Sequence, residues 1–374
     1  MKVLFRFVLG ILLSSAVSMA NDGAYTMDGN HIVPTTESDI SIKKEILSIK
    51  RVGDDILDVT VEYTLLNPKD AKSITVGFEA AAPNGGGIDG RPINGGHPYM
   101  KQFSVELNGE NIPYKVATVT TDKYIKDGKI ISNDVTAIVK NAKEIDLDFL
   151  GIGFVYYFNA LFKKGENHLI HHYRYEHSMS VESIYEFNYI LSTASRWRGN
   201  QIDDFTLHID MGEYQEFTID RTFFDSFNEW THDGEARDIT YNRIEKENIK
   251  GAKFYTIHKP ISFHKKDFKI TGDLILGSYV STEISFEDRK FNYRKDNLAY
   301  LSEKVRSFTK VPRGSLSHKI LRNHPYAKRG YVFKNQAIQR YYDKMVWYIP
   351  NPSYKASRDD LIKEDIEWLR KLGN

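Results

Sequence analysis

The chain has 374 residues, of which 41% are hydrophobic and 27% charged, a composition typical of a folded globular protein with one large or two ordinary domains. It contains no cysteine, which excludes a disulfide scaffold, a zinc or iron–sulfur site with cysteine ligands, a cysteine nucleophile and an N-terminal lipid anchor on cysteine. The 51 Lys and Arg and 50 Asp and Glu nearly balance, but they are unevenly distributed along the chain.

The first twenty residues predict a secretory signal peptide. Lys2 and Arg6 precede the mostly apolar stretch 7–17, and residues 18–20 place small side chains where signal peptidase recognises them. This apolar stretch is shorter than the roughly 20 residues of a transmembrane helix, and no later stretch approaches that length. We therefore expect a mature chain that begins near Asn21, has no transmembrane helix, and lies in the periplasm or on the cell surface. A bacterial source is expected, since secreted eukaryotic domains usually carry disulfides.

Residues 21–298 predict mainly antiparallel β-structure. Apolar and polar residues alternate from Leu57 to Leu65, which is typical of a strand with one buried face. Asn108-Gly109 predicts the turn of a hairpin because both central residues must accept positive φ. Residues 154–162 and 168–177 predict a second hairpin around the turn residues 163–167. Short strands with turns between them favour a β-sandwich, as one domain or two. Further strands are expected at 40–49, 73–78, 205–210 and 254–258.

Residues 299–374 predict a small helical module, so the expected fold class is α+β multidomain, with the β-sandwich first. Helices are expected at 299–308, at 317–322 with Pro325 as the stop, and at 336–346. A last helix is expected to start in a capping-box-like pair, Ser357 and Asp360. Its apolar face would comprise Leu361, Ile362, Ile366 and Leu369.

Charge follows the same division of the chain. Residues 300–374 carry a net charge of +9, whereas residues 21–299 carry −10. The basic module is therefore expected either to meet an anionic partner or to dock on the acidic β region of the same chain.

Four histidines crowd the stretch from His168 to His177. On a strand, His168 and His172 would face one way and His171 and His177 the other, so two on one face would need help from a neighbouring strand to bind a metal. No His-Glu-x-x-His motif is present, and polar strand positions with an aromatic core are the alternative interpretation. We expect no bound metal and no cofactor.

Other candidate motifs carry little chemistry. The glycine-rich stretch 84–96 lacks the ending of a phosphate-binding loop and predicts a loop between strands. Asp203 and Asp204 are adjacent, so on a strand they would point to opposite faces and would not form an acid/base pair. The Gly-x-Ser-x-Gly nucleophile motif of serine hydrolases is absent.

The most distinctive stretch lies at the C-terminal end, between Leu316 and Pro350. It contains Leu321-Arg322-Asn323, the pentapeptide Tyr326-Ala327-Lys328-Arg329-Gly330, Tyr331-Val332-Phe333 and Trp347-Tyr348-Ile349-Pro350. Over about residues 313–372 this resembles the YARHG domain, a small extracytoplasmic bacterial domain. Lys and Arg replace the Arg and His of the family's eponymous motif, which keeps positive charge but moves the guanidinium by one residue. The region from Asn21 is similar to an uncharacterised exported β-rich family that often precedes this domain.

The resemblance implies a role at the bacterial cell wall, by association with wall-associated proteins. Together with the basic charge, it predicts a non-catalytic envelope protein that binds peptidoglycan or another anionic wall polymer, with no nucleic-acid partner. Aromatic rings could stack on sugars or form the module's core. Two alternatives remain: a metal-dependent hydrolase around 168–177, and an adaptor whose sandwich binds another envelope protein by edge-strand addition. The predicted binding residues are Arg322, Tyr326, Lys328, Arg329, Tyr331 and Trp347.

Overall fold

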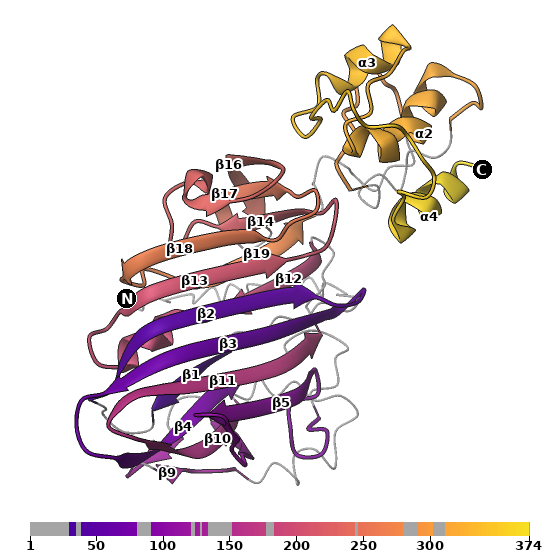
Figure 1. Cartoon of the computed structure of the whole chain (residues 1–374). Coiled ribbons are helices and arrows are strands. Elements are labelled where there is room, and N and C mark those ends of the chain that lie inside the picture. Colours follow the sequence, from indigo (N-terminus) through magenta and orange to yellow (C-terminus); the bar gives the residue numbers. More distant parts are fainter. Residues whose placement is uncertain are drawn as a thin grey trace, which may run out of the picture.

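The structure is a computed structural model of the whole chain, and it shows a β region followed by a helical module (Figure 1). The predicted fold class, α+β with a mainly antiparallel β-sandwich first, is confirmed. The residues that the structure describes are 30–34, 39–80, 91–120, 124–127, 129–133, 152–176, 183–243, 246–279, 291–301 and 311–373. The predicted signal peptide lies outside them, as do His177, most of the glycine-rich stretch and most of the helix expected at 299–308.

One long sheet forms the front layer of the β region in Figure 1. Its eight strands run in the order β15-β18-β13-β2-β3-β11-β5-β6, and all neighbours are antiparallel except the parallel pair β2 and β13. The strands are β2 (Ser41–Arg51), β3 (Ile56–Asn67), β5 (Met100–Leu107), β6 (Glu110–Asn111), β11 (Gly165–Glu176), β13 (Ile202–Asp210), β15 (Trp230–Thr231) and β18 (Ile261–Phe268).

Two smaller sheets pack behind the long one. A four-stranded sheet has the order β1-β4-β10-β7, and a five-stranded sheet has the order β12-β19-β14-β17-β16. One continuous hydrophobic core contains residues of all three sheets. The strands are β1 (Asn30–Pro34), β4 (Lys72–Ala80), β7 (Lys115–Thr120), β10 (Ile152–Phe162), β12 (Ser183–Tyr189), β14 (Glu216–Asp220), β16 (Glu235–Arg243), β17 (Lys246–Tyr255) and β19 (Leu274–Tyr279); β8 (Ile125–Lys126) and β9 (Lys129–Ile130) form a separate pair.

The alternation in β3 is as predicted, because Leu57, Val59, Val61, Tyr63 and Leu65 are all buried. The Asn108-Gly109 turn is confirmed too, with φ of 54° and 85°. Its return strand, β6, is only two residues long because the chain then crosses to the four-stranded sheet.

The hairpin predicted from residues 154–162 and 168–177 is wrong. β10 pairs with β4 and β7, whereas β11 pairs with β3 and β5 of the opposite layer. The buried side chain of Asn167 holds the connection between them, accepting from the backbone N–H of Lys163 at 2.8 Å and donating to the carbonyls of Lys163 and Gly165. A connection built this way can cross between layers, since its hydrogen bonds need no ladder between the two strands.

The helical module lies at one end of the β region (Figure 1) and contains α2 (Leu316–Lys328), α3 (Gln336–Tyr342) and α4 (Lys363–Lys371). The prediction that Pro325 stops the first of these helices is wrong, since the proline lies inside α2. A proline at this position removes the N–H that would bond the carbonyl of Leu321. That carbonyl instead accepts from the indole Nε1 of Trp368 in α4, at 2.8 Å.

Two further helix boundaries differ from the predictions. α3 ends at Tyr342, four residues early. α4 starts at Lys363 after the uncapped Ile362, so Ser357 and Asp360 do not start it. The buried face of α4 contains Asp365, Trp368 and Leu369, whereas Ile366 is 44% exposed.

Candidate functional site

The six predicted binding residues do not share one surface. Arg322 is exposed, and Tyr326 and Tyr331 are half-buried. Lys328, Arg329 and Trp347 are buried, with only 5–6% of each residue exposed. Their ligand-binding role stays a prediction, but the structure shows what the three buried ones contact inside the molecule.

The pentapeptide 326–330 forms the C-terminal end of α2. Gly330 has a φ of 79°, and the N–H groups of Gly330 and Tyr331 donate to the carbonyls of Ala327 and Tyr326 at 2.8 and 3.0 Å. This pair of hydrogen bonds is the Schellman motif, which ends many helices. A Cβ on Gly330 would lie 2.3 Å from the carbonyl oxygen of Ile349, so the position requires glycine for both its conformation and its space.

Lys328 and Arg329 turn inward to one carboxylate. The Nζ of Lys328 lies 2.6 Å from Oδ1 of Asp365, and Nη1 of Arg329 lies 2.7 Å from Oδ2. Arg329 also donates to the carbonyls of Asp360, at 2.7 and 3.0 Å, and of Pro325, at 2.8 Å. All three charged side chains are almost fully buried, so this is an internal ion cluster between α2 and α4.

Burial and charge act in opposite directions on these groups. Burial raises the pKa of the Asp365 carboxyl, but Lys328 and Arg329 outweigh it and hold the pKa below its ordinary value. Burial lowers the pKa of the Lys328 ammonium, and the attraction of Asp365 opposes this effect only in part. The carboxylate is therefore ionised and compensates two buried cations.

The same cations touch the β region. The guanidinium of Arg329 lies 4.1 Å from the ring centroid of Tyr214, which follows β13, and the Nζ of Lys328 lies 5.9 Å from it. Tyr300 lies in the connection to the module, and its ring centroid is 5.7 Å from the Nζ of Lys328. The hydroxyl of Tyr300 donates to the carbonyl of Thr256 at 2.7 Å. Cations over tyrosine faces are attracted by the ring quadrupole, more strongly when water is excluded. We call this contact, made by Lys328, Arg329, Asp365, Tyr214 and Tyr300, the joint.

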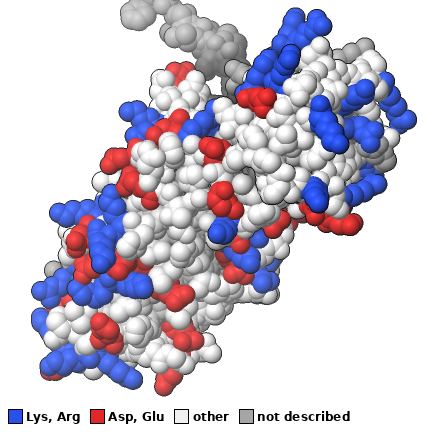
Figure 2. Space-filling model, turned by 45° about the horizontal axis from the view of Figure 1, so that its top comes forward, with Lys and Arg blue, Asp and Glu red and all other residues white. Residues whose placement is uncertain are grey.

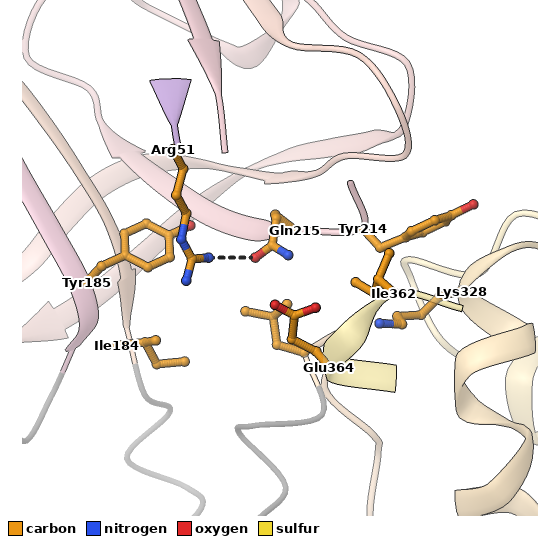
Figure 3. A pocket seen from close by; sticks show the side chains of 9 residues that line it. Arg51, Ile184, Tyr185, Tyr214, Gln215, Lys328, Ile362 and Glu364 are labelled. Carbon is orange, nitrogen blue, oxygen red and sulfur yellow. Dashed lines mark hydrogen bonds between the residues drawn. The ribbon is translucent and has the colours of Figure 1, made fainter. Parts of the chain in front are cut away.

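A narrow cleft opens beside the joint (Figure 3). The β region contributes Arg51, Ile184, Tyr185, Tyr214 and Gln215, and the C-terminal part contributes Leu301, Lys328, Ile362 and Glu364. Cavities with apolar walls and a few polar groups at domain junctions are common small-molecule sites.

The outer surface of the module remains basic although Lys328 and Arg329 are buried. Figure 2 shows blue side chains gathered over the module and few red ones among them. The exposed basic residues are Arg313, Lys319, Arg322, Lys334, Arg340, Lys344, Lys355, Arg358, Lys363, Arg370 and Lys371.

The histidine segment follows the predicted alternation of faces on β11. His171 is fully buried among aromatic rings, including those of Phe78 and Tyr173, while His172 faces outward with its Nε2 2.9 Å from Asp58. Within the described ranges, no group of three or more His, Asp or Glu residues could hold a metal ion. Asp203 and Asp204 take separate partners, Lys43 and His264.

Sequence reasoning missed Asp365 and Tyr214. Asp365 could have been found, because it lies at helical spacing with Trp368, Leu369 and Leu372 and is the charged member of that apolar face. Tyr214 carries no local signal, since its partner is more than 100 residues away in the sequence.

Comparisons with known proteins bear on the C-terminal module and on the fold. No curated protein matches the chain. A proposed nutrient binding protein from Legionella pneumophila is similar in structure, with 18% identity, coverage of 94% of this chain and 99% of that chain, and a TM-score of 0.49. An M1 zinc metallopeptidase from Deinococcus radiodurans is 9% identical over 64% of this chain and 42% of that chain, with a TM-score of 0.22. No helix in the described part of the chain is long and apolar enough to span a membrane.

The family comparison agrees with the motif. The YARHG domain model matches residues 314–373, which include the pentapeptide, the three helices and the ion cluster around Asp365. The C-terminal module of this chain is therefore a YARHG domain.

Proposed function

We propose that this chain is an exported, non-catalytic protein of the bacterial cell envelope that binds peptidoglycan or another anionic wall polymer. Its YARHG domain would make the contact, through the exposed basic side chains rather than through Lys328 and Arg329. Export is supported by the signal-peptide pattern of residues 1–20.

The observation that carries the proposal is the separation of the domain's charges into two sets. Lys328 and Arg329 are compensated internally by Asp365, whereas Lys319 and Arg322 stand exposed on α2 without a described ion pair. Their spacing of three residues places both on one face of that helix. An uncompensated basic face attracts polyanions over a distance set by the salt concentration.

The half-buried tyrosines of the domain supply a second element. Tyr326 and Tyr331 are partly exposed: Tyr326 lies one turn after Arg322 on α2, and Tyr331 follows the end of that helix. A tyrosine ring combines an apolar face with a polar edge, which suits contact with sugars. Trp347 is instead part of the domain's core, where its indole donates to the carbonyl of Leu298 at 3.0 Å.

Co-sedimentation with purified peptidoglycan tests the proposal. The full mature chain should sediment with sacculi at low salt and be released as salt rises, because the charges that carry the contact are exposed. Lys319→Ala/Arg322→Ala should weaken binding by about tenfold, since each exposed pair contributes up to about 1 kcal/mol.

A matched variant removes the same charge from the β region. Lys259→Ala/Lys266→Ala neutralises two exposed lysines there and should sediment like the unmodified protein. Equal losses in both double variants would show a non-specific charge effect. Absence of sedimentation at low salt would refute wall binding.

A further inference from the structure

One face of α2 is open to solvent. Within the stretch 318–328 of this helix, the residues that are not buried are Lys319, Arg322, Asn323 and Tyr326. Counted from Lys319, the other three follow at spacings of three, four and seven residues, which places all of them on one side of the helix. We call these four residues the α2 face.

The two cations of the α2 face have no described carboxylate partner. Lys319 and Arg322 are both exposed, and neither forms an ion pair with a described residue. At a spacing of three residues their Cβ atoms lie about 5–6 Å apart on the helix, where like charges repel each other. An anion bound beside both side chains would remove this repulsion, so the α2 face favours a ligand with negative charge.

Asn323 adds a hydrogen-bond acceptor next to these cations. Its Nδ2 donates to the carbonyl of Lys319 at 2.7 Å. Because a carbonyl only accepts, the amide oxygen of Asn323 must point away from that carbonyl, and no described residue donates to this oxygen. The oxygen therefore suits a ligand that carries an N–H group, such as the acetamido group of an N-acetylated sugar.

Tyr326 supplies an aromatic ring at the C-terminal end of the α2 face. The side chain is partly exposed and packs against the hydrophobic core of the domain, which restricts its movement. Tyr326 lies one helical turn after Arg322, so a sugar ring packed on the tyrosine has its substituents close to the guanidinium. Lys319 and Tyr326 are about 10 Å apart along the helix axis, close to the length of one disaccharide unit of a glycan.

We infer that the α2 face binds glycan strands of peptidoglycan from which the stem peptides have been removed. One sugar packs on Tyr326, its acetamido N–H donates to Asn323, and the lactyl carboxylate of the muramic acid accepts from Arg322 and Lys319. That carboxylate is attached directly to the sugar and is free only after removal of the peptide, since in intact peptidoglycan it forms the amide bond to the peptide. The inference rests on the wall-binding proposal and names the part of the wall that is bound.

Co-sedimentation of the full mature chain with sacculi, before and after peptide removal, tests the inference. An amidase that cleaves between muramic acid and the stem peptide frees the lactyl carboxylates and leaves the glycan strands intact. Digested sacculi should bind at least about tenfold more tightly than untreated sacculi, because charge-assisted hydrogen bonds are added. N-acetylchitohexaose has the acetamido groups but no carboxylate, so it should compete at least about tenfold more weakly than soluble peptide-free strands.

Two variants test the uncharged part of the α2 face. Tyr326→Leu keeps an apolar side chain against the core but removes the ring, and Asn323→Leu removes the acceptor at similar size. Each should weaken binding to digested sacculi by about fivefold or more. Tyr114→Leu is the matched control, since Tyr114 is 38% exposed in the β region, and it should bind like the unmodified chain. Circular dichroism checks that all three variants are folded.

Three results would overturn the inference. They are equal or weaker binding after digestion, equal competition by N-acetylchitohexaose, or losses in both α2 variants no larger than the loss in Tyr114→Leu. The first comparison uses the unmodified chain and so does not depend on the folding of a variant. In each case salt-sensitive sedimentation with untreated sacculi would leave the wall-binding proposal in place, whereas no sedimentation with either form of sacculi would refute both.

Discussion

The guanidinium of Arg329 lies 4.1 Å from the ring centroid of Tyr214, so the fourth residue of the YARHG pentapeptide contacts the β region directly. The same side chain forms an ion pair with Asp365 and hydrogen bonds with two carbonyls of its own domain. Arg329 therefore links α2 to α4 within the domain and also contacts the β region.

Removing the tyrosine should weaken the joint. Tyr214→Ala should lower the free energy of unfolding by about 2–4 kcal/mol, because a buried aromatic ring and its cation contacts are lost. Tyr214→Phe keeps the ring and should cost less than about 1 kcal/mol. Chemical denaturation measures both, and equal stability of the alanine and phenylalanine variants would contradict a role for the ring in holding the joint.

Removing the shared carboxylate should be more damaging. Asp365→Asn leaves Lys328 and Arg329 buried without compensating charge, so we expect the free energy of unfolding to fall by about 3–5 kcal/mol. The exposed Asp359→Asn is a control of the same chemistry on the same domain and should change stability by less than about 0.5 kcal/mol. Similar denaturation midpoints for the two variants would show that the ion cluster contributes little.

The stability of the domain should fall on acidification through His324. Burial, followed by the neighbouring Lys328, lowers the pKa of this histidine to about 3. Its Nε2 donates to the carbonyl of Ala299 at 2.8 Å, and its ring packs against Trp347 and Trp368. The unfolded histidine takes up its proton near pH 6.5, so the free energy of unfolding should fall by about 1.4 kcal/mol per pH unit below that value.

Denaturation curves between pH 7 and pH 4 measure this slope. His324→Gln keeps a donor for the Ala299 carbonyl but cannot be protonated, so the part of the slope due to His324 should disappear. Asp365 acts at lower pH: its pKa is depressed, so its contribution is present above its unfolded pKa and is lost as pH falls below it. An unchanged slope in the glutamine variant would contradict the assignment to His324.

The sequence-based predictions succeed where the signal is local. The period-two pattern of Leu57 to Leu65 and the Asn108-Gly109 turn depend on neighbouring residues alone, and both are found as expected. The second hairpin fails because turn residues around Asn167 end a strand without specifying which sheet the next strand joins. The prediction that Pro325 ends the helix fails because the hydrogen bond that the proline removes from the Leu321 carbonyl is replaced by one from the indole of Trp368 in α4.

The candidate site shows the same limit. The pentapeptide was identified from the sequence, and its glycine has a local reason, the left-handed conformation at the end of α2. The orientation of Lys328 and Arg329 depends on Asp365 and Tyr214, which are distant in sequence. A basic motif with its charge partner elsewhere in the chain resembles a surface ligand site until that partner is known.

The Leu321 carbonyl accepts a hydrogen bond from Trp368 in place of the backbone N–H that Pro325 lacks, and a pair of variants tests this replacement. Trp368→Phe removes the donor to the Leu321 carbonyl and should lower the free energy of unfolding by about 1–2 kcal/mol. Pro325→Ala supplies a helical N–H to the same carbonyl, so the combined variant should recover part of the loss. Strictly additive effects in urea denaturation would contradict this coupling.

Lysine labelling by an amine-reactive ester, read by mass spectrometry with and without sacculi, tests the central claim most directly. In the free protein Lys319, Lys334 and Lys344 should react readily, and Lys328 at least about tenfold more slowly, because it must wait for local opening. Sacculi should protect exposed lysines of the YARHG domain and leave Lys328 as it was. Fast labelling of Lys328 in the free protein, together with its protection by sacculi, would contradict the account and assign the pentapeptide to the wall.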